Sequence, residues 1–148
     1  MFANRLSRGL SFMFAEKLMI MKYSSGAKDL IVYQHAFKLA MDIFTESKNF
    51  PKEERYSLTD QIRRSSRSVC INLSEGYAKR RYPAHFVSKL TDSDMELGET
   101  GNWLDFALAC EYISNSQYEI LIQRKDEIGK MLGKMIQHPE KFLPRPRP

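Results

Sequence analysis

The chain has 148 residues, of which 43% are hydrophobic and 28% are charged, and this balance excludes global disorder and predicts one domain with a single core. The formal net charge of +5 permits a nucleic-acid or acidic-membrane partner without requiring one. No apolar run approaches the roughly 20 residues of a membrane-spanning helix, so we expect no membrane partner.

Residues 1–28 form a basic leader that differs from the rest of the chain. Five basic residues stand there against one acidic residue, Glu16. The apolar stretches are too short and interrupted for a secretory signal. Two explanations stay open: a segment similar to a transit peptide, or translation that begins at Met13, Met19 or Met21. We expect this leader to be poorly ordered, or to form a short helix against the body of the protein.

The first two helices of the body are bounded by capping residues and prolines. The first is predicted from Asp29, a suitable N-cap, to about Lys48. Pro51 and the acidic residues that follow it favour the start of a second helix. This helix is predicted to continue to about Ala78, and the basic residues that follow it lead to a break at Pro83.

The second helix carries three different faces when it is wound at 3.6 residues per turn. An apolar stripe predicts the side that enters the core. A seam of polar and mostly small residues lies beside it, and arginines occupy the far side. The stripe is Leu58, Ile62, Val69, Leu73 and Gly76, the polar seam is Gln61, Ser65, Ser68, Asn72 and Glu75, and the basic face is Arg63, Arg64 and Arg67.

The third helix, predicted over about residues 84–112, is apolar on two sides. One side carries the phenylalanine and leucines of a bundle core. The other side carries Met95, Trp103, Phe106 and Cys110. A four-helix bundle covers only one side of each helix, so the second side predicts self-association. The alternative is that the N-terminal leader of the same chain covers Trp103 and Phe106.

A fourth helix is predicted from Ser114 or Ser116 to about Gln137, before a His-Pro pair. Residues 139–148 follow as a basic, proline-rich tail, in which Leu143 to Pro148 cannot be helical and should be extended. Four amphipathic helices with short connections predict an all-α, antiparallel up-down-up-down four-helix bundle over residues 29–138.

Residues suited to catalysis or metal binding are not grouped in the sequence. His35, His85 and His138 have no partner at metal-ligand spacing, and no Glu-x-x-His pair of the ferritin type occurs. No glycine-rich phosphate loop and no nucleophile–base pattern is present. We expect no enzyme activity, no metal and no cofactor, although a zinc site from two histidines, Cys70 and Cys110 is the alternative. Both cysteines are interpreted as reduced core residues of a cytoplasmic protein.

Basic residues are the better candidates for function, as contacts to phosphates. Tyr77 and Tyr82 flank the second of two basic groups, where they can stack on unpaired bases. The alternative is that the basic faces are only solvated. Glu96 and Glu99 are expected to pair with arginines of the second helix, in the same subunit or the next. The basic set is Arg63, Arg64 and Arg67, then Lys79, Arg80 and Arg81, then Arg145 and Arg147 in the tail.

Several short motifs between residues 29 and 137 together resemble a known family. They are Asp29 to Ala36, Phe50-Pro51, Glu53 to Tyr56, Leu58, Gln61 to Arg64, Ser68, Asn72, Glu75-Gly76, and Glu96 with Glu99. In these motifs the chain resembles the four-helix-bundle proteins encoded in intervening sequences of bacterial 23S rRNA genes. It is also similar to the accessory proteins of diversity-generating retroelements.

Two departures from the family pattern change what the resemblance implies. Cys70 stands where the family often has proline. Because cysteine keeps the backbone N–H that proline lacks, this implies a straighter second helix. Lys89 and the acids Asp92 and Asp94 stand where relatives tend to be more basic, which argues against a nucleic-acid role for the third helix.

The resemblance implies a homo-oligomer, which is a five-subunit barrel in characterised relatives. In the retroelement branch it also implies binding of nucleic acid and of a reverse transcriptase through a basic exterior, and it brings no catalytic residues. We therefore expect a pentamer that binds structured RNA or DNA, with a structural adaptor that recruits a protein as the alternative. Ion pairs between the arginines of the second helix and Glu96 or Glu99 of a neighbouring subunit would favour the adaptor. The expected subunit contacts are Met95, Trp103, Phe106 and Cys110, with Glu96, Glu99, Asn72 and Glu75 in polar pairs.

Overall fold

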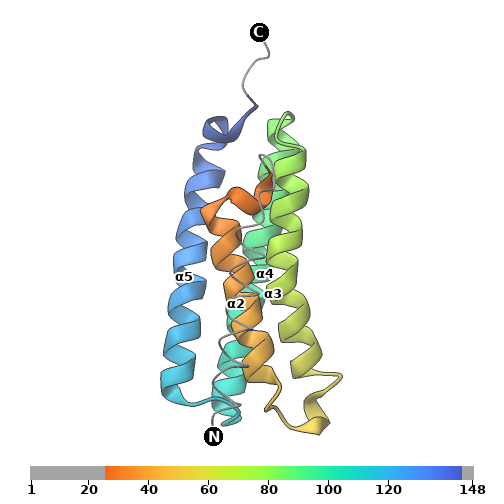
Figure 1. Ribbon diagram of the computed structural model, residues 1–148, viewed down its shortest axis with the longest axis vertical. Coiled ribbons are helices and arrows are strands. Elements are labelled where there is room, and N and C mark those ends of the chain that lie inside the picture. The colour runs from red at the N-terminus through yellow and green to blue at the C-terminus, as the bar shows by residue number, and fades with distance from the viewer. Residues whose placement is uncertain (1–25, 145–148) are drawn as a thin grey trace, which may run out of the picture.

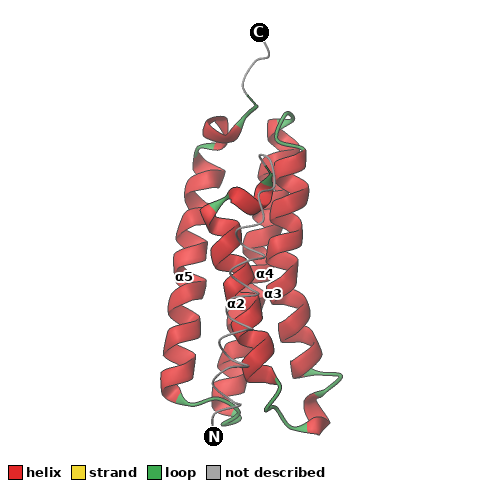
Figure 2. Cartoon of the chain, viewed as in Figure 1, coloured by secondary structure: helices red, strands yellow, loops and turns green. Residues whose placement is uncertain are grey.

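The computed structural model describes residues 26–144, which form four long α-helices and three short 3₁₀ turns (Figure 1). No strand occurs in this part of the chain, so the expected all-α fold is confirmed for it (Figure 2). Most of the predicted basic leader lies outside the described residues, as do Arg145 and Arg147 of the tail. The elements are η1 (Ala27–Asp29), α2 (Ile31–Ser47), η2 (Lys52–Glu54), α3 (Leu58–Ala78), α4 (Pro83–Ala109), α5 (Asn115–Gln137) and η3 (Pro139–Phe142).

Helix α2 begins at Ile31, and the predicted cap by Asp29 is wrong. The carboxylate of Asp29 accepts a hydrogen bond from the backbone N–H of Gly26 at 3.2 Å. Asp29 therefore closes the 3₁₀ turn η1, which precedes the helix, and its side chain is not available to cap α2.

The second predicted helix starts later than Pro51, because the 3₁₀ turn η2 intervenes and α3 begins only at Leu58. Glu54 accounts for this start. Its carboxylate accepts hydrogen bonds from the Ser57 hydroxyl at 2.7 Å and from the Leu58 backbone N–H at 3.1 Å. The acidic side chain thus satisfies a backbone donor of the first turn of α3 from outside the helix.

Glu54 also gives a prediction about pH, because hydrogen bonds from Ser57, Leu58 and Tyr112 hold the pKa of its carboxyl below the ordinary value. A carboxyl with a lowered folded-state pKa stabilises the fold above its unfolded pKa and loses that contribution as the pH falls through the folded value. We expect Glu54→Gln to melt below the wild type at pH 7, with a difference that narrows between about pH 5 and pH 3. Thermal melts followed by circular dichroism at several pH values measure this difference in melting temperature, and Glu53→Gln is the exposed control. A difference between Glu54→Gln and the wild type that does not change with pH would contradict the prediction.

The remaining helix ends follow the sequence more closely. Pro83 occupies the first position of α4, and Ser114 caps α5 through reciprocal hydrogen bonds with Gln117, at 2.7 Å and 3.1 Å. Helix α4 ends at Ala109, short of the predicted Tyr112. The chain turns out of the helix at Glu111, which has a φ of 60°.

One apolar core lies between the four helices. The predicted apolar stripe of α3 is buried throughout, from Leu58 to Gly76. None of the described helices contains a stretch long and apolar enough to cross a membrane. The largest fully buried apolar side chains are Leu39 and Ile43 of α2, Ile62 and Leu73 of α3, Phe86, Leu90, Leu97 and Leu104 of α4, and Ile128 and Leu132 of α5.

Small and polar residues bring α3 and α4 close together. The Thr100 hydroxyl donates to the Ser65 hydroxyl at 2.9 Å, and the Ser93 hydroxyl donates to the Val69 carbonyl at 2.8 Å. All three hydroxyl-bearing side chains are buried, so each hydrogen bond satisfies groups that water cannot reach. Ser65, a member of the predicted polar seam, therefore serves the contact between these two helices.

Candidate functional site

The three arginines predicted to share one basic face of α3 turn to different neighbours. The Arg64 guanidinium contacts two acids of α4, Glu99 at 3.1 Å and Glu96 at 3.6 Å. Arg63 and Arg67 turn instead toward α2. The single basic face is therefore wrong, because successive helical residues are about 100° apart and α3 lies between α2 and α4.

Arg63 and Arg67 join Lys48 around the ring of Phe44, and we call these four residues the Phe44 cluster. The cations lie over the ring at 4.7 Å for Lys48, 4.9 Å for Arg63 and 5.8 Å for Arg67, measured to the ring centroid. Phe44 of α2 and Lys48, the C-cap of that helix, are four residues apart, as are Arg63 and Arg67 of α3, so each pair lies on one side of its helix. The Arg63 Nε also donates to the buried Ser47 hydroxyl at 2.8 Å.

The charge of the Phe44 cluster is not balanced by acidic side chains. Among residues 26–144, no carboxylate forms an ion pair with Lys48, Arg63 or Arg67. Three like charges around one ring repel one another, and a bound anion relieves that repulsion. Because cations cover the Phe44 ring, the cluster is suited to phosphate groups rather than to stacked bases.

The second basic group, Lys79 to Arg81, lies in the turn after α3, well away from the Phe44 cluster. Sixteen residues of nearly continuous helix separate Arg63 from Lys79, which corresponds to roughly 24 Å. Arg80 stacks on the ring of Tyr77 at 4.0 Å and donates to the Tyr77 carbonyl at 2.9 Å. The predicted stacking surface of Tyr77 is therefore occupied by Arg80. Tyr82 is 60% exposed and packs edge-on against His85.

The predicted second apolar side of α4 lies on the surface of the single chain. Met95 is 69% exposed and Phe106 56% exposed, while Trp103 is half-buried with its ring 5.9 Å from that of Phe106. The Trp103 Nε1–H donates to Glu99 at 3.2 Å, and Glu99 in turn pairs with Arg64. Exposure of these rings fits the predicted role in self-association, which stays a prediction.

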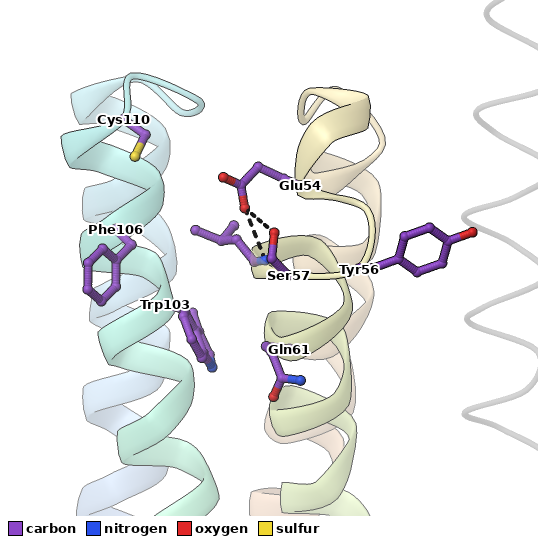
Figure 3. A pocket seen from close by; sticks show the side chains of 8 residues that line it. Glu54, Tyr56, Ser57, Gln61, Trp103, Phe106 and Cys110 are labelled. Carbon is purple, nitrogen blue, oxygen red and sulfur yellow. Dashed lines mark hydrogen bonds between the residues drawn. The ribbon is translucent and has the colours of Figure 1, made fainter.

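Trp103 and Phe106 belong to a groove of about 420 Å³ between α4 and the start of α3 (Figure 3). Figure 3 shows the groove from the side, with Tyr56 pointing away from it. The lining residues are Glu54, Tyr56, Ser57, Leu58, Gln61, Trp103, Phe106 and Cys110.

The two cysteines have different environments, and the interpretation of both as core residues is wrong for Cys110. Cys70 is buried, and burial raises the pKa of its thiol to about 12, so it stays protonated. Cys110 is exposed at the end of the groove. Among the described residues, no group of three or more His, Cys, Asp or Glu side chains is arranged to hold a metal ion.

The other predicted polar pairs form within the chain. Glu75 pairs with Lys89 of α4 at 2.8 Å, and the Asn72 amide donates to the Ser68 carbonyl of its own helix at 3.0 Å. Glu96 and Glu99 both pair with Arg64 of the same subunit, which was one of the two arrangements expected. Sequence reasoning missed Phe44 and Lys48, and their four-residue spacing, equal to that of Arg63 and Arg67, was the available signal.

Comparisons with known proteins give a family and similar solved structures. The model of the family described as 23S rRNA-intervening sequence protein matches residues 28–134. A crystal structure from Bacteroides thetaiotaomicron, of a protein with unknown function from the S23 ribosomal protein family, is similar at 30% identity with a TM-score of 0.66. The similarity covers 72% of this chain and 96% of that one. No curated protein matches the chain.

Proposed function

The chain belongs to the 23S rRNA-intervening sequence protein family, and from this premise we propose that it is a non-enzymatic, antiparallel four-helix bundle that self-associates and binds structured RNA or DNA through phosphates. The order of contacts supports the antiparallel arrangement, since Arg64, early in α3, meets Glu99, and Glu75, late in α3, meets Lys89. The observation that carries the binding proposal is the Phe44 cluster, whose three cations have no carboxylate partner in the described part of the chain.

The spacing of the basic groups favours a nucleic acid over a small anion. The Phe44 cluster and the group from Lys79 to Arg81 are separated by roughly 24 Å along α3. One strand of a duplex places about seven phosphates over that distance. A small anion can occupy only one of the two groups. Contacts to phosphates carry no sequence information by themselves, so we expect weak dependence on base sequence.

The test uses Lys48→Ala combined with Arg67→Ala. Neither side chain donates a hydrogen bond to another described residue, so their removal should leave the fold intact, whereas loss of Arg63 would strip the buried Ser47 hydroxyl of its donor. We expect affinity for a labelled RNA hairpin to fall at least about tenfold at low salt. The slope of log affinity against log salt should fall by about two. Fluorescence anisotropy over a salt series measures both, with a matched DNA hairpin in parallel.

Arg64→Ala is the matched control, because the Arg64 guanidinium is already paired with Glu96 and Glu99. Its RNA affinity should equal that of the wild type. Equal losses in the control and the double variant would show that general charge, rather than the Phe44 cluster, accounts for binding. Absence of binding by a folded wild type at low salt would overturn the nucleic-acid function.

A structural adaptor that recruits a protein is the second candidate, and the internal pairing of Arg64 favours it, although the paired acids belong to the same chain and not to a neighbouring subunit. Intrachain ion pairs with Glu96 and Glu99 remove this guanidinium from the set available to phosphates. The adaptor would not need the Phe44 cluster for phosphate contacts. It is therefore the function left if the RNA and DNA hairpins do not bind.

A further inference from the structure

We propose that the groove beside Trp103 and Phe106 receives the side chain of Tyr56 from a second copy of this chain. This inference rests on the self-association in the proposed function and names the contact that produces it. Tyr56 lies at the edge of the groove, but its side chain points away from it, so one subunit presents both halves of the contact (Figure 3).

Tyr56 has the features of an inserting side chain. It is 86% exposed, more than any other large hydrophobic residue in the described part of the chain. It lies between η2 and α3, in a segment held by the hydrogen bonds of Glu54 to Ser57 and Leu58. Because the backbone of this segment is already ordered, little backbone entropy is lost when the ring is buried. Aromatic side chains presented in this way often anchor protein interfaces.

The groove offers an aromatic and apolar surface for that ring. Trp103 and Phe106 lie on α4, and Leu58, only 6% exposed, lies on the α3 side. Tilted ring pairs such as Trp103 with Phe106 accept a third aromatic ring by edge or offset contacts. The volume of about 420 Å³ leaves room for an inserted aromatic ring.

Polar groups on the two sides also match. A buried tyrosine hydroxyl needs a hydrogen-bond partner. Gln61 lines the groove, and its side-chain amide forms no hydrogen bond with another described residue, so it is available to the hydroxyl. The Arg55 guanidinium lies 5.6 Å from the centre of the Tyr56 ring and would arrive with it. On the other copy the guanidinium would lie near Glu54, which carries the one carboxylate among the residues that line the groove.

This geometry also bears on the type of symmetry. Tyr56 points away from the groove of its own subunit (Figure 3), so the contact joins two different surfaces of neighbouring copies. Such a head-to-tail contact repeats from subunit to subunit and closes into a ring or continues as a filament. An isologous dimer would instead require Tyr56 of each copy to enter the groove of the other across one two-fold axis, and covalent products larger than dimers distinguish the two arrangements.

Photo-crosslinking tests the contact while keeping an aromatic ring at position 56. The analogue p-benzoylphenylalanine replaces Tyr56 in full-length protein, and isotopically light and heavy chains are mixed before irradiation. We expect crosslinks between light and heavy chains that map to the part of α4 containing Trp103 and Phe106. Covalent products should extend beyond dimers, as a head-to-tail contact requires. The same analogue at Tyr82, which is 60% exposed at the other end of α4, should not crosslink there.

Light scattering of Tyr56→Ala is the second measurement. The assembly should shift to smaller species while the helical circular dichroism signal is retained, and Tyr82→Ala should leave the mass unchanged. Intact oligomers whose crosslinks map to another surface would overturn this contact but not the self-association. A monomeric wild type would overturn both. Crosslinks confined to a single chain would show that the chain fills its own groove, and would also overturn the proposal.

Discussion

Replacing Gly76 by valine is expected to lower the free energy of unfolding by about 2–3 kcal/mol. A Cβ atom at this position would lie 2.8 Å from the Cβ of Lys89, and 3.5 Å from a ring carbon and the carbonyl oxygen of Phe86. The Lys89 Cβ is fixed to the backbone of α4 and cannot rotate away. Valine adds two further methyl groups, so α3 and α4 must separate, and the neighbouring core contacts are weakened.

Two other helical glycines provide controls for this prediction. A Cβ added at Gly98 or Gly133 would meet nothing within 4 Å. Alanine there should stabilise the protein by about 0.5–1 kcal/mol through helix propensity alone. Urea unfolding followed by circular dichroism measures all three variants. If Gly76→Val unfolds at the same urea concentration as the wild type, the close approach of α3 and α4 at this point is not real.

The helical period in the sequence was sufficient to predict the core of the bundle. Burial follows the 3.6-residue repeat, so the apolar stripe of α3 and the phenylalanine and leucines of α4 were identified without knowledge of neighbouring helices. The family resemblance is also confirmed, by the match over residues 28–134. The start of α3 was not predictable in the same way, because Glu54 delays it by hydrogen bonds that depend on a turn outside the helix.

The candidate site depended on contacts between helices, which periodicity does not give. Arg63 and Arg64 are adjacent in sequence, yet one meets α2 and the other meets α4. The neighbours of each arginine depend on how α2, α3 and α4 are arranged. This arrangement divides the expected basic face into the Phe44 cluster, which is suited to anions, and an ion pair within the chain. Lys48 enters the cluster from another helix. The juxtaposition of Glu54 and Cys110 in the groove likewise joins segments that are far apart in sequence.

Replacing Phe86 by alanine is expected to lower the free energy of unfolding by about 3–5 kcal/mol, the range found for large aromatic side chains in cores. The Phe86 side chain is fully buried, and its ring packs edge-to-face against Phe142 of η3, with the ring centroids 6.2 Å apart. Removal of the ring leaves a cavity that the close α3–α4 contact at Gly76 cannot easily fill. Urea denaturation of the two proteins measures the difference.

Phe106→Ala is the matched comparison, because it removes the same side chain from the same helix at a position that is 56% exposed. In the isolated subunit this change should cost no more than about 0.5 kcal/mol, as for most surface substitutions. Its effect should instead fall on assembly, so the unfolding midpoint of the wild type should rise with protein concentration more than that of the variant. Unfolding measured at two protein concentrations separates the effect on the stability of the single subunit from the effect on assembly. A concentration-independent loss from Phe106→Ala as large as that from Phe86→Ala would mean that the second apolar side of α4 stabilises the single chain rather than a contact between chains.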